Sequence, residues 1–432
     1  MIEYLYSQNP WWKNPELIKI DPDYNEWMNS PIKWVPKFIN KLSLKPFSLN
    51  FLIGPRQVGK TTAIKILISK LLNENPSESI FYFTCELLKD YRDLYEILRK
   101  YIYEIKKPFG IEKSYIFLDE VSFVNEWWRT IKYMIDRNYF KNDVVTITGS
   151  TSPKIKGEIE LFPGRRGYGR DVIAYPLTFK EYISILNSDL NLKSTLNLNE
   201  LDKIMRYNFK YIEELQMLFK SYIITGGFPI PIKTYFEKRM LEERIFKTYL
   251  TWIENDILKA DRNLIYAKQL ISSIILKAPS ALSYDSIAKD TDIKSHKTVA
   301  SYIETFRKMY IMELLYHYDP FKGRPIYRRE KKVIIIDPFI ANALSKWTLT
   351  KIKYEALMEW IVQSHLKKFF HETYYYRNSR FEINTLIKFE DKTFGFEVKL
   401  KKRKIRIPNW IDKLYLISED EIPPSILMAS IG

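Results

Sequence analysis

The residues with the clearest chemical signature lie between Gly54 and Thr61, where the chain reads GPRQVGKT. This is the spacing G-x-x-x-x-G-K-[ST], in which glycines let backbone N–H groups close around phosphate oxygens. Lys60 is expected to lie against the β- and γ-phosphates of a nucleotide, and the Thr61 hydroxyl to bind Mg²⁺. The residues predicted to contact the nucleotide are Gly54, Pro55, Arg56, Gln57, Val58, Gly59, Lys60, Thr61 and Thr62. The alternative, a tight turn without a ligand, is disfavoured in a chain with only 13 glycines.

A second candidate set is the pair of carboxylates Asp119 and Glu120. The four residues before them, Tyr115 to Leu118, are apolar, as in a buried parallel strand that delivers acids to the edge of a sheet. We expect Asp119 to hold Mg²⁺ through water and Glu120 to polarise the attacking water. Such a strand is a weak signal alone, and it gains weight from its place about 60 residues after the glycine-rich loop.

Polar residues after a further apolar strand add candidates for sensing or stabilising phosphate charge. The stretch DVVTITGST places Thr148 and Ser150 at the end of that strand, where an ordinary strand-to-loop turn would use the same residue types. The loop FPGRRG then offers Arg165 and Arg166, which are expected to neutralise developing charge on a nucleotide in their own subunit or a neighbouring one. A solvated basic turn is the alternative for either arginine.

The elements that must position these residues follow from hydrophobic periodicity. Ser48 to Ile53 reads as a short buried strand, and apolar residues recur at helical spacing from Thr62 onward. Strand, glycine-rich loop and helix in this order form the setting that a phosphate-binding loop needs, because the helix N-terminus faces the anion. The sequence therefore predicts an α/β core with a parallel sheet.

Five motifs in this order give the chain a family resemblance: GPRQVGKTT, LDEVSFVNEWWRTIKYMID, TITGSTS, FPGRRGYGRDVIAYPLTFKEY and GGFP. Together they resemble the prokaryotic AAA-superfamily P-loop ATPases, abundant in archaea, that carry a winged helix and a C-terminal nuclease-like domain of the PD-(D/E)xK type. The resemblance implies ATP and Mg²⁺ as cofactors, and it implies a helical lid after the P-loop core. In ring-type ATPases a polar residue at this place senses the γ-phosphate, which makes Thr148 and Ser150 candidates for that role.

The stretch from Ser283 predicts a helix-turn-helix with a wing. Ser286–Asp290 fits a short helix, and a second helix begins at Ser295 with Val299, Ile303 and Phe306 on one face. The basic hairpin FKGRPIYRREKK follows. The candidate DNA contacts are His296, Lys297, Arg324, Arg328 and Arg329. A protein–protein module or an ATPase lid is the alternative role for such a winged helix.

Near the end of the chain, Glu397 and Lys399 form Glu-x-Lys on a predicted strand, an arrangement that metal-dependent nucleases use. The resemblance places a helical glutamate at Glu359 and an acid at position 384, where this chain has Asn384. An amide is a poor ligand for a hard divalent cation, and Glu382 is about 6–7 Å away along the strand. We therefore expect a degenerate nuclease site on a nucleic-acid or interaction platform, and the basic run 399–406 suits such a platform or a solvated edge strand.

Composition limits the classes of protein to consider. The chain has 432 residues and a formal net charge of +16, which favours nucleic acid or another polyanion as a partner, although a Lys-rich surface of thermophile type is the alternative. One cysteine excludes internal disulfides and a cysteine-based zinc site. The first residues lack a signal-peptide pattern and no apolar run reaches membrane-spanning length, so we expect a cytoplasmic protein.

The predicted organisation runs from a Trp-rich segment (1–45) through a P-loop core (46–175), a helical lid (176–265) and a winged helix (266–335) to a nuclease-like α/β domain (336–432). The tryptophans of the first segment are expected to pack on the core, or else to shelter a base. We expect Mg²⁺-dependent ATP hydrolysis coupled to action on DNA, with a homo-oligomer possible. The alternatives are a slow nucleotide-gated switch with protein partners and an ATP-regulated nuclease.

Overall fold

The computed structural model describes residues 2–150, 162–379, 381–399 and 407–432, and for Ser150 only its backbone. The chain divides into two compact units, Met1–Tyr175 and Pro176–Gly432. Each unit contains one sheet, and each is described separately below. Among the described residues, no helix is both long and apolar enough to cross a lipid bilayer.

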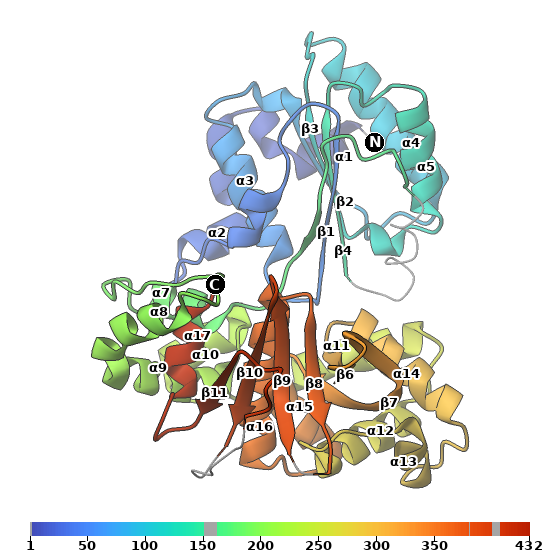
Figure 1. The fold of residues 1–432 in the computed structure, drawn as a ribbon. Coiled ribbons are helices and arrows are strands. Elements are labelled where there is room, and N and C mark those ends of the chain that lie inside the picture. Colours follow the sequence, from blue (N-terminus) through green and yellow to red (C-terminus); the bar gives the residue numbers. More distant parts are fainter. Residues whose placement is uncertain (1, 151–161, 380, 400–406) are drawn as a thin grey trace. The chain divides into compact units, whose positions relative to one another are not determined.

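The first unit is built on a parallel sheet with the strand order β2-β3-β4-β1-β5. The strands are β1 (Ser48–Gly54), β2 (Ile80–Thr84), β3 (Tyr115–Asp119), β4 (Val144–Ser150) and β5 (Asp171–Ile173). The helices are α1 (Ile2–Gln8), α2 (Pro22–Met28), α3 (Lys60–Leu71), α4 (Tyr91–Lys100) and α5 (Trp127–Asp136). Helix α3 covers one face of the sheet, and α4 and α5 cover the other (Figure 1). Both faces are thus covered, and every residue of β1 and β3 is buried.

The strand order decides which residues meet at the carboxyl edge of this sheet. Strand β4 lies between β1 and β3, and its register pairs Leu52 with Thr148. The loop after β1 therefore has the end of β4 as its neighbour, and the end of β3 follows next. Ligands of open parallel sheets bind at this carboxyl edge.

The amino-terminal segment covers the outer edge of β2 with side chains instead of another strand. Asn9 is fully buried; its amide donates to the Tyr82 carbonyl at 2.9 Å and accepts from the Tyr82 N–H at 2.7 Å. Both indole N–H groups of Trp11 and Trp12 donate to the Ile80 carbonyl. Trp11 and Trp12 are buried, so they pack on the core as predicted. Exposed sheet edges invite pairing with other chains, and this segment closes one.

The second unit begins with helices. They are α7 (Phe179–Leu186), α8 (Leu201–Asn208), α9 (Ile212–Thr225), α10 (Pro229–Lys238), α11 (Glu243–Lys259), α12 (Leu264–Lys277), α13 (Tyr284–Lys289) and α14 (His296–Lys308). Later helices are α15 (Pro338–Thr348), α16 (Tyr354–Phe369) and α17 (Pro424–Ser430). The turn between α9 and α10 requires glycine, because Gly226 has φ 57° and ψ −157°. Next to it, the Gly227 N–H donates to Asp337, the residue that caps α15.

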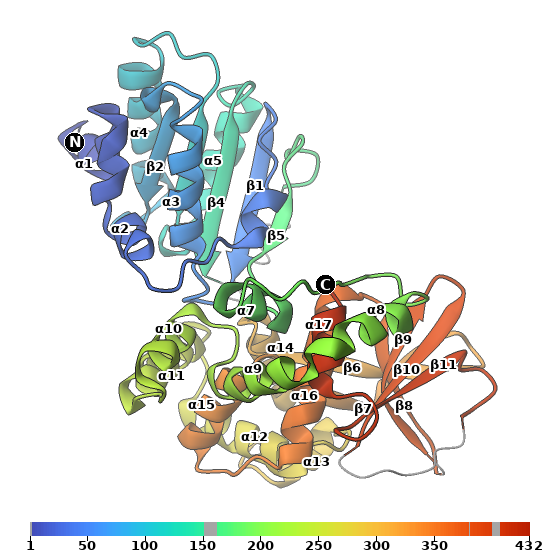
Figure 2. The ribbon, with the colours of Figure 1, turned by 90° about the vertical axis from the view of Figure 1, so that its left-hand side faces the viewer.

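The sheet of the second unit has the strand order β11-β10-β9-β8-β6-β7, and α16 lies against it (Figure 2). Its strands are β6 (Met312–Asp319), β7 (Arg324–Ile335), β8 (Thr373–Arg377), β9 (Glu382–Phe389), β10 (Lys392–Val398) and β11 (Lys413–Ile417). The hairpin expected as a wing at residues 321–332 is instead the turn after β6 and most of β7, and the hairpin of the structure is formed by β6 and β7. Strand β6 also pairs with β8 at His317 and Tyr375. The wing and the C-terminal strands thus share one sheet, so residues 266–335 and 336–432 are not separated as two compact units.

Candidate nucleotide site

The loop between β1 and α3 adopts backbone conformations that only a few residue types accept readily. Gly59 has φ 81°, and a Cβ placed there would lie 3.0 Å from the ring of Trp34. Gln57 takes a left-handed φ of 61° without being glycine. Residues in such conformations concentrate at binding sites, where the surroundings hold them in place. The Lys60 ammonium folds back over the loop and donates to the carbonyls of Gly54 and Pro55 at 3.1 and 2.9 Å.

Asp119 is the centre of a hydroxyl network at the carboxyl edge. Its Oδ2 accepts from the Thr61 hydroxyl at 2.8 Å and from the Tyr82 hydroxyl at 2.9 Å. Its Oδ1 accepts from the Thr148 hydroxyl, and Thr148 in turn accepts from the Glu120 N–H at 3.0 Å. The network joins the P-loop helix to β2, β3 and β4. Asp119 is 2 % exposed, so its two oxygens are fixed in direction before any ligand binds.

Glu120 follows directly and is held in an unusual conformation. It has φ 52° and ψ 46° and begins the short 3-10 helix Val121–Phe123. Its carboxylate accepts from the Ser122 hydroxyl at 3.2 Å, and its side chain is half-buried. A left-handed turn directly after β3 lets two consecutive carboxylates leave the strand in different directions. Asp119 is turned into the network, and the Glu120 backbone N–H joins the network through Thr148.

The donor set fits Mg²⁺ with a nucleoside triphosphate. Mg²⁺ binds oxygen ligands and prefers one or two protein oxygens together with phosphate and water. The Thr61 hydroxyl and the Asp119 carboxylate are adjacent, and Lys60 supplies a positive charge beside them. The N-terminus of α3 opens on the same loop, which favours a phosphate group. The predicted contact residues 54–62 thus lie together with Asp119, Glu120 and Thr148.

A buried ion pair behind Asp119 was not predicted from the sequence. Lys65 of α3 pairs with Asp21 at 2.8 Å, and its ammonium lies 3.2 Å from the centre of the Tyr82 ring. Burial lowers the pKa of Lys65, whereas burial and then the Asp119 charge raise the pKa of Tyr82 well above its ordinary value. Lys65 stands among Ile64, Ile66, Leu67 and Ile68, and a lysine in such an apolar run is the signal that points to it.

The structure does not bring the two loop arginines to the P-loop of the same chain. The Leu49 N–H donates to the Arg166 carbonyl, which places this loop beside the start of β1, about 16 Å from its end. Arg165 forms a bidentate ion pair with Asp136, with N···O distances of 2.8 and 3.2 Å, and Arg166 forms an ion pair with Asp171. A nucleotide contacted by Arg165 or Arg166 would therefore have to be bound by a neighbouring chain. The Ser150 side chain lies outside the described residues.

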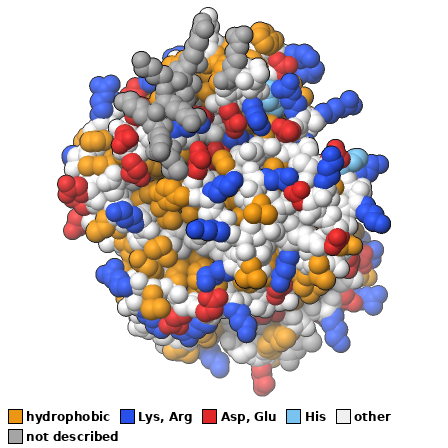
Figure 3. Space-filling model, turned by 90° about the horizontal axis from the view of Figure 1, so that it is seen from below, with side chains coloured by type: hydrophobic (Ala, Val, Ile, Leu, Met, Phe, Trp, Pro, Cys, Tyr) orange, Lys and Arg blue, Asp and Glu red, His pale blue; other side chains and the backbone are white. Residues whose placement is uncertain are grey.

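The helix-turn-helix residues lie on the surface of the second unit. Helix α14 begins after Ser295 and buries Val299, Ile303 and Phe306, in agreement with the predicted face. The candidate contacts His296, Lys297, Arg324, Arg328 and Arg329 are exposed. At the wing, a hollow of about 460 Å³ is lined by Lys322, Arg324, Pro325, Ile326, Tyr327 and Arg328. Figure 3 shows one face of the molecule, on which basic side chains are spread among acidic and hydrophobic ones.

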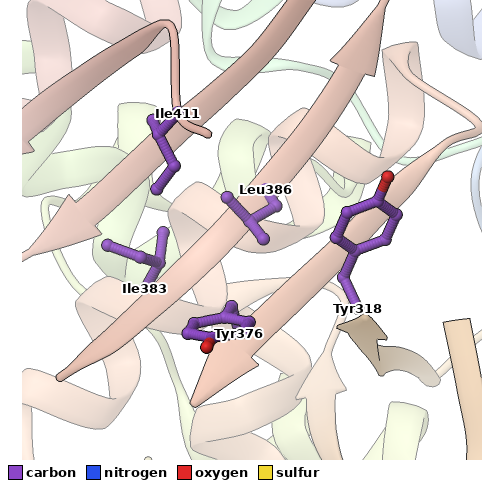
Figure 4. Close-up of a cluster of buried hydrophobic side chains, with 5 residues drawn as sticks. All are labelled: Tyr318, Tyr376, Ile383, Leu386 and Ile411. Atoms are coloured by element: carbon purple, nitrogen blue, oxygen red, sulfur yellow. The ribbon is translucent and has the colours of Figure 1, made fainter. Parts of the chain in front are cut away.

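The predicted nuclease residues do come together, on α16, β9 and β10. Asn384 donates its N–H to Glu397 at 2.7 Å, and Lys399 pairs with Glu397 at 2.7 Å. Strand β9 has one residue more than β8 opposite this point, since Tyr374 pairs with Leu386 and Tyr376 with Ile383. This bulge turns Ile383 and Leu386 toward one apolar cluster, which includes Tyr318, Tyr376 and Ile411 (Figure 4).

Comparison with known families identifies part of the chain. Residues 47–183 match the family model described as an AAA domain. Residues 216–351 match a second model, described as a domain of unknown function, DUF8612. An uncharacterized protein from Haemophilus influenzae is 24 % identical over 303 residues, and the match covers 66 % of each chain. The chain thus spans slightly less than two thirds of that relative's length.

Solved structures give weaker likenesses. The Walker-type ATPase paby2304 of Pyrococcus abyssi is 14 % identical with a TM-score of 0.42, covering 68 % of this chain and 90 % of that one. The Orc1 protein of Aeropyrum pernix, solved in complex with DNA, is 14 % identical with a TM-score of 0.31, covering 78 % of this chain and 96 % of that one. At such scores these likenesses add nothing to the argument from the site.

Proposed function

We propose that the chain is a Mg²⁺-dependent ATPase whose catalytic site lies between the P-loop and the ends of β3 and β4. The observation that carries the proposal is the convergence of Thr61 and Thr148 on Asp119, beside the ammonium of Lys60. A lone P-loop motif gives no such network, because the hydroxyls of Thr61, Tyr82 and Thr148 come from three separate segments of the chain. The match of residues 47–183 to an AAA domain supports the same activity.

Each residue has a defined task in this proposal. Lys60 neutralises charge on the β- and γ-phosphates, and the N–H groups of the loop orient them. Thr61 directly, and Asp119 through water, would hold Mg²⁺, which supplies positive charge to the phosphates when bound. Glu120 orients the attacking water and accepts its proton. Thr148 fixes both carboxylates, one through its hydroxyl and the other through the Glu120 N–H.

Steady-state ATP hydrolysis tests the assignment. Lys60→Ala should reduce turnover to background, since the phosphate charge then lacks its main counter-charge in the loop. Lys70→Ala is a matched control, because Lys70 belongs to the same helix α3 and is exposed to solvent. If Lys60→Ala keeps wild-type turnover in a clean preparation, the site assignment is refuted.

We further propose that the second unit contacts DNA through α14 and the wing. The net charge of +16 and the exposed Arg324 and Arg328 support this. Affinity for duplex DNA should fall steeply as salt rises, and Arg324→Ala with Arg328→Ala should weaken binding and reduce that salt dependence. DNA contact at the wing would be refuted by an affinity for DNA that does not change with salt concentration. A double variant that binds DNA with the affinity of the wild type would refute it as well.

A nucleotide-gated switch with protein partners is the second candidate. The observation in its favour is a set of large hydrophobic side chains exposed on α9, on α12 and in the loop after α10 of the second unit. They are Met217, Met240, Ile265 and Leu276, each at least 60 % exposed. Slow ATP turnover that does not respond to duplex or single-stranded DNA, together with nucleotide-dependent association, would favour the switch over the DNA-coupled ATPase.

A further inference from the structure

Lys332 of β7 reaches into the carboxylate cluster that resembles a nuclease site. Its side chain is 2 % exposed, and its ammonium pairs with Glu359 of α16 and with Glu382 of β9. The neighbouring Lys331 faces elsewhere: its ammonium donates to the Arg329 carbonyl and lies over the Tyr284 ring. Because successive side chains of a strand point to opposite faces of the sheet, Lys332 enters the cluster and Lys331 lies outside it.

Most of the oxygens that a metal ion would need are already engaged by this chain. Glu359 Oε1 accepts from Lys332 and from Gln363, the latter at 2.9 Å. Glu397 uses one oxygen for Lys399 and the other for the Asn384 N–H. Asn384 turns its own side-chain oxygen to the Val398 N–H at 2.7 Å. Across the described parts of the chain, no group of three His, Cys, Asp or Glu side chains is placed to hold a metal ion.

The charges of the cluster balance without a metal ion. Three carboxylates, Glu359, Glu382 and Glu397, face the cations of Lys332 and Lys399, and Arg377 lies 3.6 Å from Glu382. Burial raises the pKa of Glu359 to about 7 although Lys332 lies beside it, so its charged form depends on that ammonium. A divalent cation would have to displace the buried Lys332 and would be repelled by Lys399 and Arg377. It would also meet the amide of Asn384 where a carboxylate ligand is needed.

We infer that the ammonium of Lys332 is the resident cation of this cluster, in the place where a nuclease of this type would hold a divalent metal ion. The residues present do not fit a catalytic metal. They fit an ionic joint that fastens the wing hairpin to α16 and β9. The C-terminal strands are accordingly a non-nucleolytic platform that carries the wing.

Other contacts at the same place show how this joint is made. Strand β6 pairs with β8 only at His317 and Tyr375 in the described register. Side chains supplement this single pair: the Tyr375 hydroxyl donates to the Glu330 carbonyl at 2.6 Å, and the Trp360 indole donates to the Val333 carbonyl at 2.9 Å. These acceptors flank Lys332 on β7, so the ion pairs are the centre of the attachment.

Metal binding and thermal unfolding of the nucleotide-free full chain test the inference. Mn²⁺ binding is followed at pH 8 by the EPR signal of the free ion, in wild type and in Lys332→Met, Lys331→Met and Lys332→Met/Asn384→Asp. Lys332→Met should lower the Tm by about 6–15 °C, because it leaves buried carboxylates without a partner. It should also gain a Mn²⁺ site, whose affinity rises about tenfold or more when Asn384→Asp adds a carboxylate. Lys331→Met should show neither effect.

Two further variants locate the ion and guard against a folding failure. Glu397→Gln in the Lys332→Met background should abolish the gained Mn²⁺ site, which a P-loop ion would not do. Lys332→Met/Glu359→Gln removes both partners and should recover much of the lost Tm, so it reports on the pair even if Lys332→Met is poorly folded. The inference is overturned if the wild type binds Mn²⁺ in a manner abolished by Glu397→Gln. It is equally overturned if folded Lys332→Met gains no site, or if the double variant recovers no stability.

Discussion

Replacing Tyr82 by phenylalanine isolates one hydrogen bond of the proposed catalytic site. The Tyr82 hydroxyl donates to Asp119 at 2.9 Å from β2, which is separated from the P-loop strand β1 by β3 and β4. The aromatic ring stays in place in the variant, so its packing against Lys65 is retained. The substitution therefore removes the hydrogen bond to Asp119 and little else.

The size of the effect follows from the donors that Asp119 keeps. When Thr61 turns its hydroxyl to Mg²⁺, as proposed, Tyr82 becomes the one described side chain that still donates to Oδ2. A hydrogen bond to a charged group contributes about 1.5–3 kcal/mol, which corresponds to about 10- to 100-fold in a binding constant. We expect the Mg²⁺ concentration that gives half-maximal ATP turnover to rise by about this factor.

The assay is ATP turnover over a range of Mg²⁺ concentrations, with Tyr101→Phe as the matched control. Tyr101 is also buried and stacks on Phe81 in the same unit, but its hydroxyl donates to the Glu78 carbonyl and not to Asp119. Both variants lose one buried hydroxyl, so a shared loss of stability cancels in the comparison. An unchanged Mg²⁺ requirement in Tyr82→Phe, or the same shift in Tyr101→Phe, would refute the role given to Tyr82.

Three stability predictions complete the set. Asn9→Ala should destabilise the first unit by roughly 2–4 kcal/mol and speed hydrogen exchange at the Tyr82 amide, since two buried backbone groups lose their partner; unchanged exchange would contradict this. Gly226→Ala should cost more than about 3 kcal/mol in unfolding experiments because its Cβ would lie 2.1 Å from Asp337, whereas Gly323→Ala, with φ 63° and open space, should cost only its backbone strain. Burial raises the pKa of Asp337 from 3.8 to about 6, so the folded state is favoured when this carboxyl is protonated. Its contribution to the stability of the fold is therefore fully present below pH 3.8 and is lost as pH rises through 6. Compared with Asp337→Asn, the wild type should lose up to about 3 kcal/mol of unfolding free energy over this pH range. Tm values measured across the range test this, and parallel Tm curves for the two proteins would exclude the effect.

The P-loop and the acidic strand were predictable because their information is local. GPRQVGKT and the apolar strand before Asp119 specify their own conformations within a few residues, and the structure brings them together as expected. Helix α14 is similar, since the spacing of Val299, Ile303 and Phe306 alone defines its buried face. Parallel strands that end at one sheet edge then complete the nucleotide site.

The remaining contacts depend on pairings between distant segments. Tyr82 and Asn9 are 73 residues apart, and no local pattern indicates that an amide side chain would replace a strand partner. The position of Arg166 follows from β1 and β5 being neighbours, which the order of motifs does not reveal. Lys332 looked like one more basic residue of a wing, because only the shared sheet places it beside Glu359 and Glu382.

The cover that Asn9, Trp11 and Trp12 form over β2 bears on how this protein can be dissected. The stretch that matches the AAA domain begins at residue 47, after this cover ends. A fragment cut at that boundary would keep every residue of the proposed catalytic site and expose the backbone edge of β2 to solvent and to other copies. The smallest fragment expected to stay monodisperse therefore begins with α1, and its boundary is set by protection of the β2 edge and not by the extent of the AAA-domain match.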